Sequence, residues 1–248
     1  MKGLLDQSNY QRLNRESKEQ SEAHISNMSP SWLQLWLSPR PTQRTTTAHD
    51  ASVTTAEDAI LYDFVKNNAG LSAVRETHYL SKKVVRDGKS GPPLHIHLRQ
   101  DEHFEVQQGV LGVVKNGKEY AITKDDGRIS VPSGARHTFW AHASSKEDLI
   151  FTVWVEPQGL DHGFDEAFMR NFSGYLKDCE KSKVAPSLFQ ILLFLYHSDI
   201  VLTPPFWTPI WLLVVLHHVL AYWVGAGLLG YQASYPEYSL LHEDKKLK

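Results

Sequence analysis

Short segments in which apolar and polar residues alternate constrain the fold of this 248-residue chain more than any other feature. Alternation with a period of two is typical of a strand with one buried face. Turn signals separate the segments, and Asn116-Gly117 is the strongest of them, because both positions of a tight hairpin turn favour positive φ. The pattern predicts an all-β sandwich or barrel of the jelly-roll class over residues 59–158. The expected strands are 77–85, 94–98, 103–106, 110–114, 120–123, 129–131, 137–140 and 149–156.

Four residues in this region have the chemistry of a metal site. His95 and His97 lie on one face of an expected strand, since side chains two apart share a face. Glu102 follows shortly after, and His137 follows the expected turn at 132–134. Three imidazoles and one carboxylate suit a divalent first-row metal and leave coordination positions open for water or substrate. We expect iron, and manganese, nickel, copper and zinc also fit these ligands.

The spacing of these residues resembles that of the cupin superfamily. Residues 91–109 match its first motif, in which HxH is followed by four residues, Glu, six residues and Gly, here Gly109. Residues 127–137 resemble the second motif, P-x-G-x-x-H, although Ala141 or His142 replaces its closing Asn and Asp126-Gly127 reverses its opening Gly-Asp. The resemblance covers about residues 60–157. It implies a double-stranded β-helix barrel with a metal inside, held by His95, His97, Glu102 and His137.

After residue 158 the apolar period becomes helical. Phe164, Phe168 and Phe172 share one face, and Ser187 with Gln190 has the spacing of a capping box. Residues 159–203 are therefore expected to form a helical extension. Residues 1–58 are polar and are expected to form a mostly disordered arm. The exception is a short apolar docking segment at 30–37, which would bind either the domain or a membrane surface. Residues 232–248 read as a polar tail.

Residues 204–231 are predicted to contain a transmembrane helix. The 22 residues from Ile210 to Tyr231 include no charged side chain. As a helix they would be ~33 Å long, against a hydrocarbon core of ~30 Å. Trp207, Trp211 and Tyr231 would then mark the membrane interfaces, while His217 and His218 would lie near the midplane or face another helix. The alternative is a core helix or hydrophobic hairpin of a soluble protein.

Two membrane topologies remain open. One is a tail anchor that leaves the barrel in the cytosol at an intracellular membrane. The other is a two-pass hairpin whose first arm is 188–201, which would keep the three lysines of the tail cytosolic as well. The small residues Gly225, Ala226, Gly227 and Gly230 also offer a face for close helix packing.

Composition narrows the function. A formal net charge of -2 argues against a general nucleic-acid binder. The chain has no GxGxxG after a strand, which argues against a bound nicotinamide. The whole layout is similar to cupin proteins of fungal secondary-metabolite clusters, several of which are described as oxidoreductases acting on polyketide intermediates.

That resemblance implies a metal-dependent oxidoreductase for an apolar, polyketide-like small molecule, with pairing into a homodimer through sheet edges. Glu102 could also shuttle a proton. A non-redox isomerase, dehydratase or cyclase with a Lewis-acid metal is a second hypothesis. A non-catalytic, membrane-anchored small-molecule-binding or scaffold protein is a third. His78 either enters the barrel as an acid or base or is a hydrogen-bonded histidine, and His103 is expected to face solvent.

Overall fold

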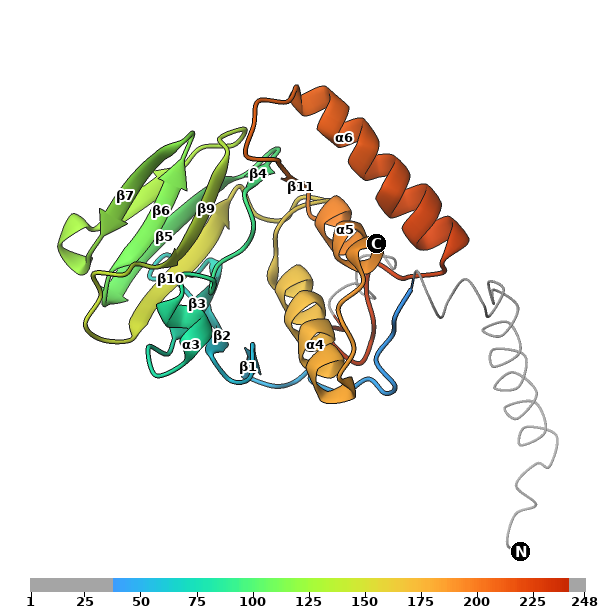
Figure 1. Cartoon of the computed structure of the whole chain (residues 1–248), viewed down its shortest axis with the longest axis horizontal. Helices are drawn as coiled ribbons and strands as arrows, with labels where there is room; N and C mark the ends of the chain where they lie inside the picture. Colours follow the sequence, from blue (N-terminus) through green and yellow to red (C-terminus); the bar gives the residue numbers. More distant parts are fainter. Residues whose placement is uncertain (1–37, 241–248) are drawn as a thin grey trace, which may run out of the picture.

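The computed structural model describes residues 38–240, so the predicted docking segment at 30–37 lies outside the described residues. Two antiparallel sheets form the body of the molecule (Figure 1). The first contains, in spatial order, β1 (Ser52–Thr55), β2 (Ile60–Lys66), β3 (Ser72–His78), β10 (Leu149–Glu156), β5 (Asp101–Gln108) and β8 (Arg128–Val131). The second contains β11 (Ile200–Leu202), β4 (His95–His97), β9 (His137–Ala141), β6 (Leu111–Lys115) and β7 (Lys118–Ile122). This arrangement confirms the predicted all-β jelly-roll.

Aromatic side chains from both sheets meet in the core. Phe104 of β5, Phe139 of β9 and Phe151 of β10 are buried, and their ring centroids lie 5.0 to 6.1 Å apart. The offset and edge-on contacts are the arrangements that aromatic pairs prefer. These rings pack the two sheets against each other in the core of the barrel.

The Asn116-Gly117 turn forms as predicted. Both residues have positive φ, 50° and 81°, and they connect β6 to β7. The segment 77–85 differs from its prediction, because β3 ends at His78 and a short helix, α3 (Lys83–Arg86), follows. A single 3₁₀ turn, η1 (Lys124–Asp126), precedes β8. Neither β1, β2 nor β11 was predicted as a strand.

Residues 38–58 depart from the expected disordered arm. Besides forming β1, this stretch is bound to helix α4 (Glu166–Ser182): the backbone N–H and the hydroxyl of Thr45 donate to the two carboxylate oxygens of Asp178, at 2.7 and 2.6 Å. Such charge-assisted hydrogen bonds to a distant helix compensate for the low apolar content of the segment. The described part of the arm is therefore ordered against the domain.

Two helices pack beside the barrel. Helix α4 begins at Asp165, whose side chain accepts a hydrogen bond from the Phe168 N–H at 2.8 Å. Helix α5 (Leu188–His197) has Ser187 at its N-cap, but no side-chain capping bond forms there. Gln190 is instead buried and donates to the Gln232 carbonyl at 2.9 Å, so the predicted capping box was wrong.

The most apolar helix comprises α6 (Ile210–His218) and its continuation in π-helical turns, η2 (Val219–Leu228). Among the described residues it is the one helix long and apolar enough to cross a membrane, by length and composition. It packs along the outside of α5 (Figure 1). His217 forms a 2.8 Å hydrogen bond with the Leu192 carbonyl and His218 a 2.9 Å bond with the Tyr196 hydroxyl, so both histidines face another helix.

Tyr231 and Gly225 have other roles in the structure than those predicted for a membrane segment. Tyr231 is buried rather than interfacial, and its hydroxyl donates to the Pro39 carbonyl at 3.1 Å. Gly225 allows close packing within this chain, because a Cβ there would lie 3.1 Å from the Phe189 carbonyl of α5. Gly225, one of the four small residues, thus packs against α5.

Candidate metal centre

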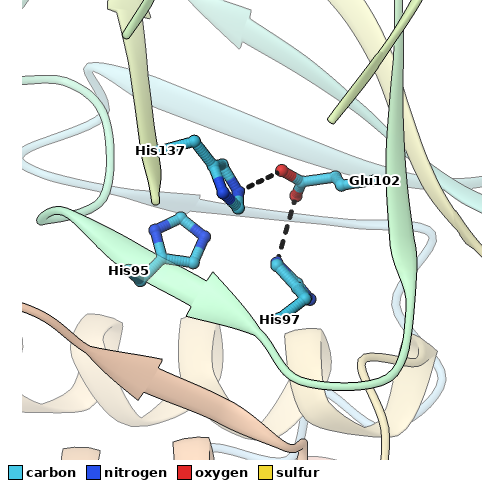
Figure 2. A group of neighbouring side chains, drawn as sticks. All are labelled: His95, His97, Glu102 and His137. Carbon is cyan, nitrogen blue, oxygen red and sulfur yellow. Dashed lines mark hydrogen bonds and ion pairs between the residues drawn. The ribbon is translucent and has the colours of Figure 1, made fainter. Parts of the chain in front are cut away.

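The four predicted ligands point toward one another in a single cluster (Figure 2). Strand β4 supplies His95 and His97, and its pairing with β9 sets His137 directly opposite His95. Glu102 reaches the same point from β5 in the other sheet. One ligand atom from each residue lies within 4.8 Å of the other three. Atoms that bind an ion at ~2.1 Å lie at most ~4.2 Å apart, so a small inward movement would form a coordination shell.

Hydrogen bonds fix the orientation of two of the imidazoles. His95 Nδ1 lies 2.9 Å from the Pro93 carbonyl, and His137 Nδ1 lies 2.9 Å from the Ala135 carbonyl. A carbonyl only accepts, so each Nδ1 carries a proton. The Nε2 of a neutral His95 then keeps its lone pair for a metal, whereas the Nε2 of His137 faces the Glu102 carboxylate. This outer-shell arrangement is the usual one for metal-binding histidines.

His97 gives the clearest sign that a group is needed at this site. Both of its ring nitrogens are buried without a hydrogen-bond partner among the described residues. Its Nε2 lies 3.6 Å from Glu102 Oε1, beyond hydrogen-bond distance, while Glu102 Oε2 accepts a 2.8 Å hydrogen bond from His137 Nε2. Buried polar atoms without partners are costly. A cation between His97 Nε2 and Glu102 Oε1 would give that nitrogen a partner, so the residues present fit a metal.

Electrostatics favour the protonation states that metal ligands require. Burial lowers the pKa of His95 to about 3, assisted by His137 and His97. Burial also lowers the pKa of His97 to about 4, despite the opposing charge of Glu102. For Glu102, burial opposes ionisation, but His97 and His137 outweigh it and hold the pKa at about 2. Neutral imidazoles and an ionised carboxylate are ready to bind a cation at neutral pH.

His137 differs from the other two histidines. Burial would lower its pKa, but the hydrogen bond to Glu102 and the charge of that carboxylate outweigh burial and raise it. The side chain therefore shares a proton with Glu102 in the absence of a cation. A metal would displace that proton, because the same lone pair binds either.

A cavity of about 460 Å³ opens from this cluster and is large enough for a small organic molecule. Three of the ligands, His95, His97 and Glu102, line one end. The walls are mainly apolar and come from the barrel and both helices: Ile60, Phe139, Val153, Phe164, Phe168, Met169, Phe172, Leu176, Ile191, Leu195, Ile200 and Leu202.

Two further histidines have defined places outside the cluster. His78 is fully buried between Glu76 and Ser90, so it is hydrogen-bonded inside the barrel wall. His103 points away from the metal ligands, as its parity predicts, but it is not solvent-facing. Its ring is covered by Trp154 and Arg128 and bonds the Ser130 hydroxyl at 2.7 Å.

Sequence reasoning missed Glu76 and Ser90, which both line the cavity. The spacing Glu76-x-His78 was a usable signal, because residues two apart on a strand share a face. Ser90 carried no such signal, since it reaches His78 only through the fold of the chain between them.

Two sheets that enclose three histidines and a glutamate at the end of an apolar cavity define a jelly-roll protein with a candidate metal centre. The probable oxidoreductase virH of Hypocrea virens is 54% identical over 213 residues, which are 86% of this chain and 97% of that protein. The oxidoreductase iacF of Pestalotiopsis fici is 48% identical over 200 residues, or 79% of this chain and 98% of that protein. This chain therefore belongs to the family of these fungal oxidoreductases.

The other comparisons do not extend this assignment. No family model matches the chain. The cupin domain of Schizosaccharomyces pombe Cnp3 is 17% identical and covers 39% of this chain and 65% of its own length, with a TM-score of 0.29. The assignment to the jelly-roll class rests on the strand order of this chain.

Proposed function

We propose that this protein is a metal-dependent oxidoreductase that acts on an apolar, polyketide-like small molecule in secondary metabolism. The observation that carries the proposal is the buried His97, whose ring nitrogens lack partners beside the ionised Glu102 at the end of an apolar cavity. The names of virH and iacF support redox chemistry. The lining supports an apolar substrate, because few polar groups would be desolvated by one.

The four residues His95, His97, Glu102 and His137 would hold the ion. A bound iron would supply redox chemistry, whereas zinc would supply a Lewis acid. The carbonyls of Pro93 and Ala135 keep two imidazoles oriented, and the aromatic walls exclude water from the reacting group. Glu102 has a second role in the proposal: its carboxylate would accept a proton from the substrate.

The identity of the resident metal tests the redox assignment. The full chain is purified without a histidine tag and without oxygen, and its metals are quantified by mass spectrometry. Near one equivalent of iron or copper is the expected result, with consumption of dioxygen or of an added electron acceptor when an apolar phenolic extract is supplied. Zinc as the only bound metal, with no consumption of either, would favour the non-redox Lewis-acid alternative.

We also propose that the apolar face of α6 and η2 seats the protein on an intracellular membrane, with the barrel in the cytosol. Trp207, Trp211 and Trp223 are 81%, 68% and 63% exposed, and no charge interrupts the helix. An exposed apolar surface of this extent is typical of an interaction site, and tryptophan is favoured at the level of lipid headgroups. Because the other face packs on α5, the helix is better placed to lie along a bilayer surface than to span it.

A further inference from the structure

A second polar cluster, which the metal site does not use, reaches the cavity through Glu76 and Ser90. Glu76 and His78 belong to β3, and Ser90 follows α3. His78 Nε2 lies 3.0 Å from Glu76 Oε2, and His78 Nδ1 lies 2.9 Å from the Ser90 hydroxyl. The three side chains are almost fully buried, with 5%, 0% and 5% of their surface exposed. Buried polar groups normally have hydrogen-bond partners, and these three side chains bond to one another.

Each hydrogen bond of the cluster has a defined donor and acceptor, in the order Ser90 to His78 to Glu76. The Ala141 N–H donates to the Ser90 oxygen at 3.4 Å, which leaves the Ser90 hydroxyl proton free for His78 Nδ1. A neutral His78 then carries its own proton on Nε2 and donates it to Glu76. Glu76 is therefore held as an acceptor. No hydrogen bond from the described residues reaches its other oxygen, Oε1, and its one ion-pair partner among them is His78.

A hydroxyl donor stands next to this acceptor. Tyr62 of β2 is the register partner of Glu76 on β3, and both side chains line the cavity. Burial and the charge of Glu76 raise the pKa of Tyr62, so its phenol keeps its proton. One acceptor and one donor side by side match a single hydroxyl group, which both donates and accepts.

This cluster is separate from the metal ligands. On β10, Phe151 pairs with Glu76, whereas Val155, four positions along, pairs with Glu102 on the opposite neighbouring strand. At strand spacings of ~3.3 Å per residue and ~4.8 Å between strands, the two glutamates are roughly 16 Å apart at their Cα atoms. The cavity thus has two polar sites with apolar walls between them.

We propose that Glu76, oriented by His78 and Ser90 and accompanied by Tyr62, binds a hydroxyl group of the substrate at a point remote from the metal ligands. The ligand class is an apolar molecule that carries a phenolic or alcoholic O–H away from its reacting group. The inference rests on the proposed function for the choice of substrate, because it places that substrate in the same cavity.

The test compares two probes that differ in one hydrogen-bond donor, 2-naphthol and 2-methoxynaphthalene. Binding of each to the full chain is measured by fluorescence, for wild type and Glu76→Gln, with the metal content of each preparation determined in parallel. Gln keeps the shape of the side chain and can still accept from His78, but it lacks the charge. Wild type should prefer 2-naphthol by at least ~10-fold, as expected for a hydrogen bond to a charged group. Glu76→Gln should lose most of that preference at unchanged metal content.

A chelator-treated sample separates this inference from the proposed function. If wild type keeps its preference after metal removal, the hydroxyl is bound at Glu76, even in a preparation that never contained metal and so contradicted the redox assignment. A preference that disappears with the metal, or one that is equal in wild type and Glu76→Gln, would overturn the inference. Ser90→Ala provides a second variant if Glu76→Gln does not fold. It keeps the carboxylate but frees His78, and it should reduce the preference by a smaller factor, whereas an unchanged preference would contradict the positioning role.

Discussion

Gly91 shows how a single residue position supports the metal site. A Cβ added there would lie 1.4 Å from the carbonyl oxygen of Phe139, so the backbone of β9 approaches too closely for any other residue. Phe139 lies two residues after His137, and Gly91 precedes the two prolines that lead to His95. The glycine therefore lets two ligand-bearing segments come together.

Replacing Gly91 with Ala is expected to destabilise the protein by at least ~3 kcal/mol, because backbone rather than a flexible side chain must move. Gly117→Ala is the matched control. Nothing lies within 4 Å of its added Cβ, and its cost is the positive φ alone, about 1 kcal/mol. Urea unfolding of both variants measures the difference, and equal losses of stability would contradict the close approach.

The candidate ligands were predictable from the sequence because they lie at short, regular spacings. His95 and His97 share a strand face, and the turn at 132–134 precedes His137 in the sequence itself. Ser90 was missed because only the fold brings it to His78, whereas Glu76 could have been found from its two-residue spacing to His78. The predicted solvent exposure of His103 was also wrong. Parity predicts which face of a strand a side chain occupies, but it does not show that Trp154 and Arg128 cover that face.

At the scale of elements, β11 is the piece that sequence reasoning could not supply. It has three residues and follows a helix, so it has too little alternation to be recognised as a strand. In the structure it pairs with β4, Ile200 opposite His97 and Leu202 opposite His95. The strand that carries two ligands thus depends on a partner about one hundred positions later. The strand predicted at 77–85 was wrong because apolar residues continue past the end of β3 at His78, through a turn and into helix α3.

The pairing predicts that Val201→Pro weakens metal binding. Proline cannot donate to a strand partner, and Val201 lies opposite Ile96, between the two histidines. We expect affinity for added metal to fall by roughly 10-fold, as when an outer-shell support of a ligand is lost. Val201→Ala removes side-chain atoms from the same place but keeps the N–H, and titration calorimetry should give it nearly wild-type affinity. Equal weakening in both variants would mean that packing, and not strand pairing, holds β4.

At the scale of the whole molecule, the barrel, the α4–α5 pair and the α6–η2 helix form successive layers (Figure 1). Sequence alone identified the apolar segment and allowed His217 to face another helix and Gly225 to pack closely, but it did not show that α5 is the helix they contact. What is left exposed is apolar and rich in tryptophan. The cavity beside the candidate metal ligands and the proposed membrane-facing surface therefore belong to the same folded unit.

Wild-type full-length protein is expected to float with phosphatidylcholine vesicles, and the double variant Trp211→Glu, Trp223→Glu is expected to remain in solution. Burying two tryptophans is worth enough to change partitioning by at least ~100-fold. Leu188→Glu with Leu240→Glu changes two exposed apolar residues outside this helix, which are 56% and 40% exposed, and should float like wild type. Flotation of the tryptophan variant with the vesicles, or wild type left in solution, would contradict membrane seating through α6 and η2.

The most direct test of the account is the metal stoichiometry of the full chain, measured for wild type beside Glu102→Ala. The central claim is that His95, His97, Glu102 and His137 jointly hold one ion. We predict close to one equivalent in wild type and a loss of most bound metal in Glu102→Ala, with circular dichroism showing that the variant keeps its β structure. A folded wild-type chain without metal even after reconstitution, or Glu102→Ala with an undiminished equivalent, would contradict the claim.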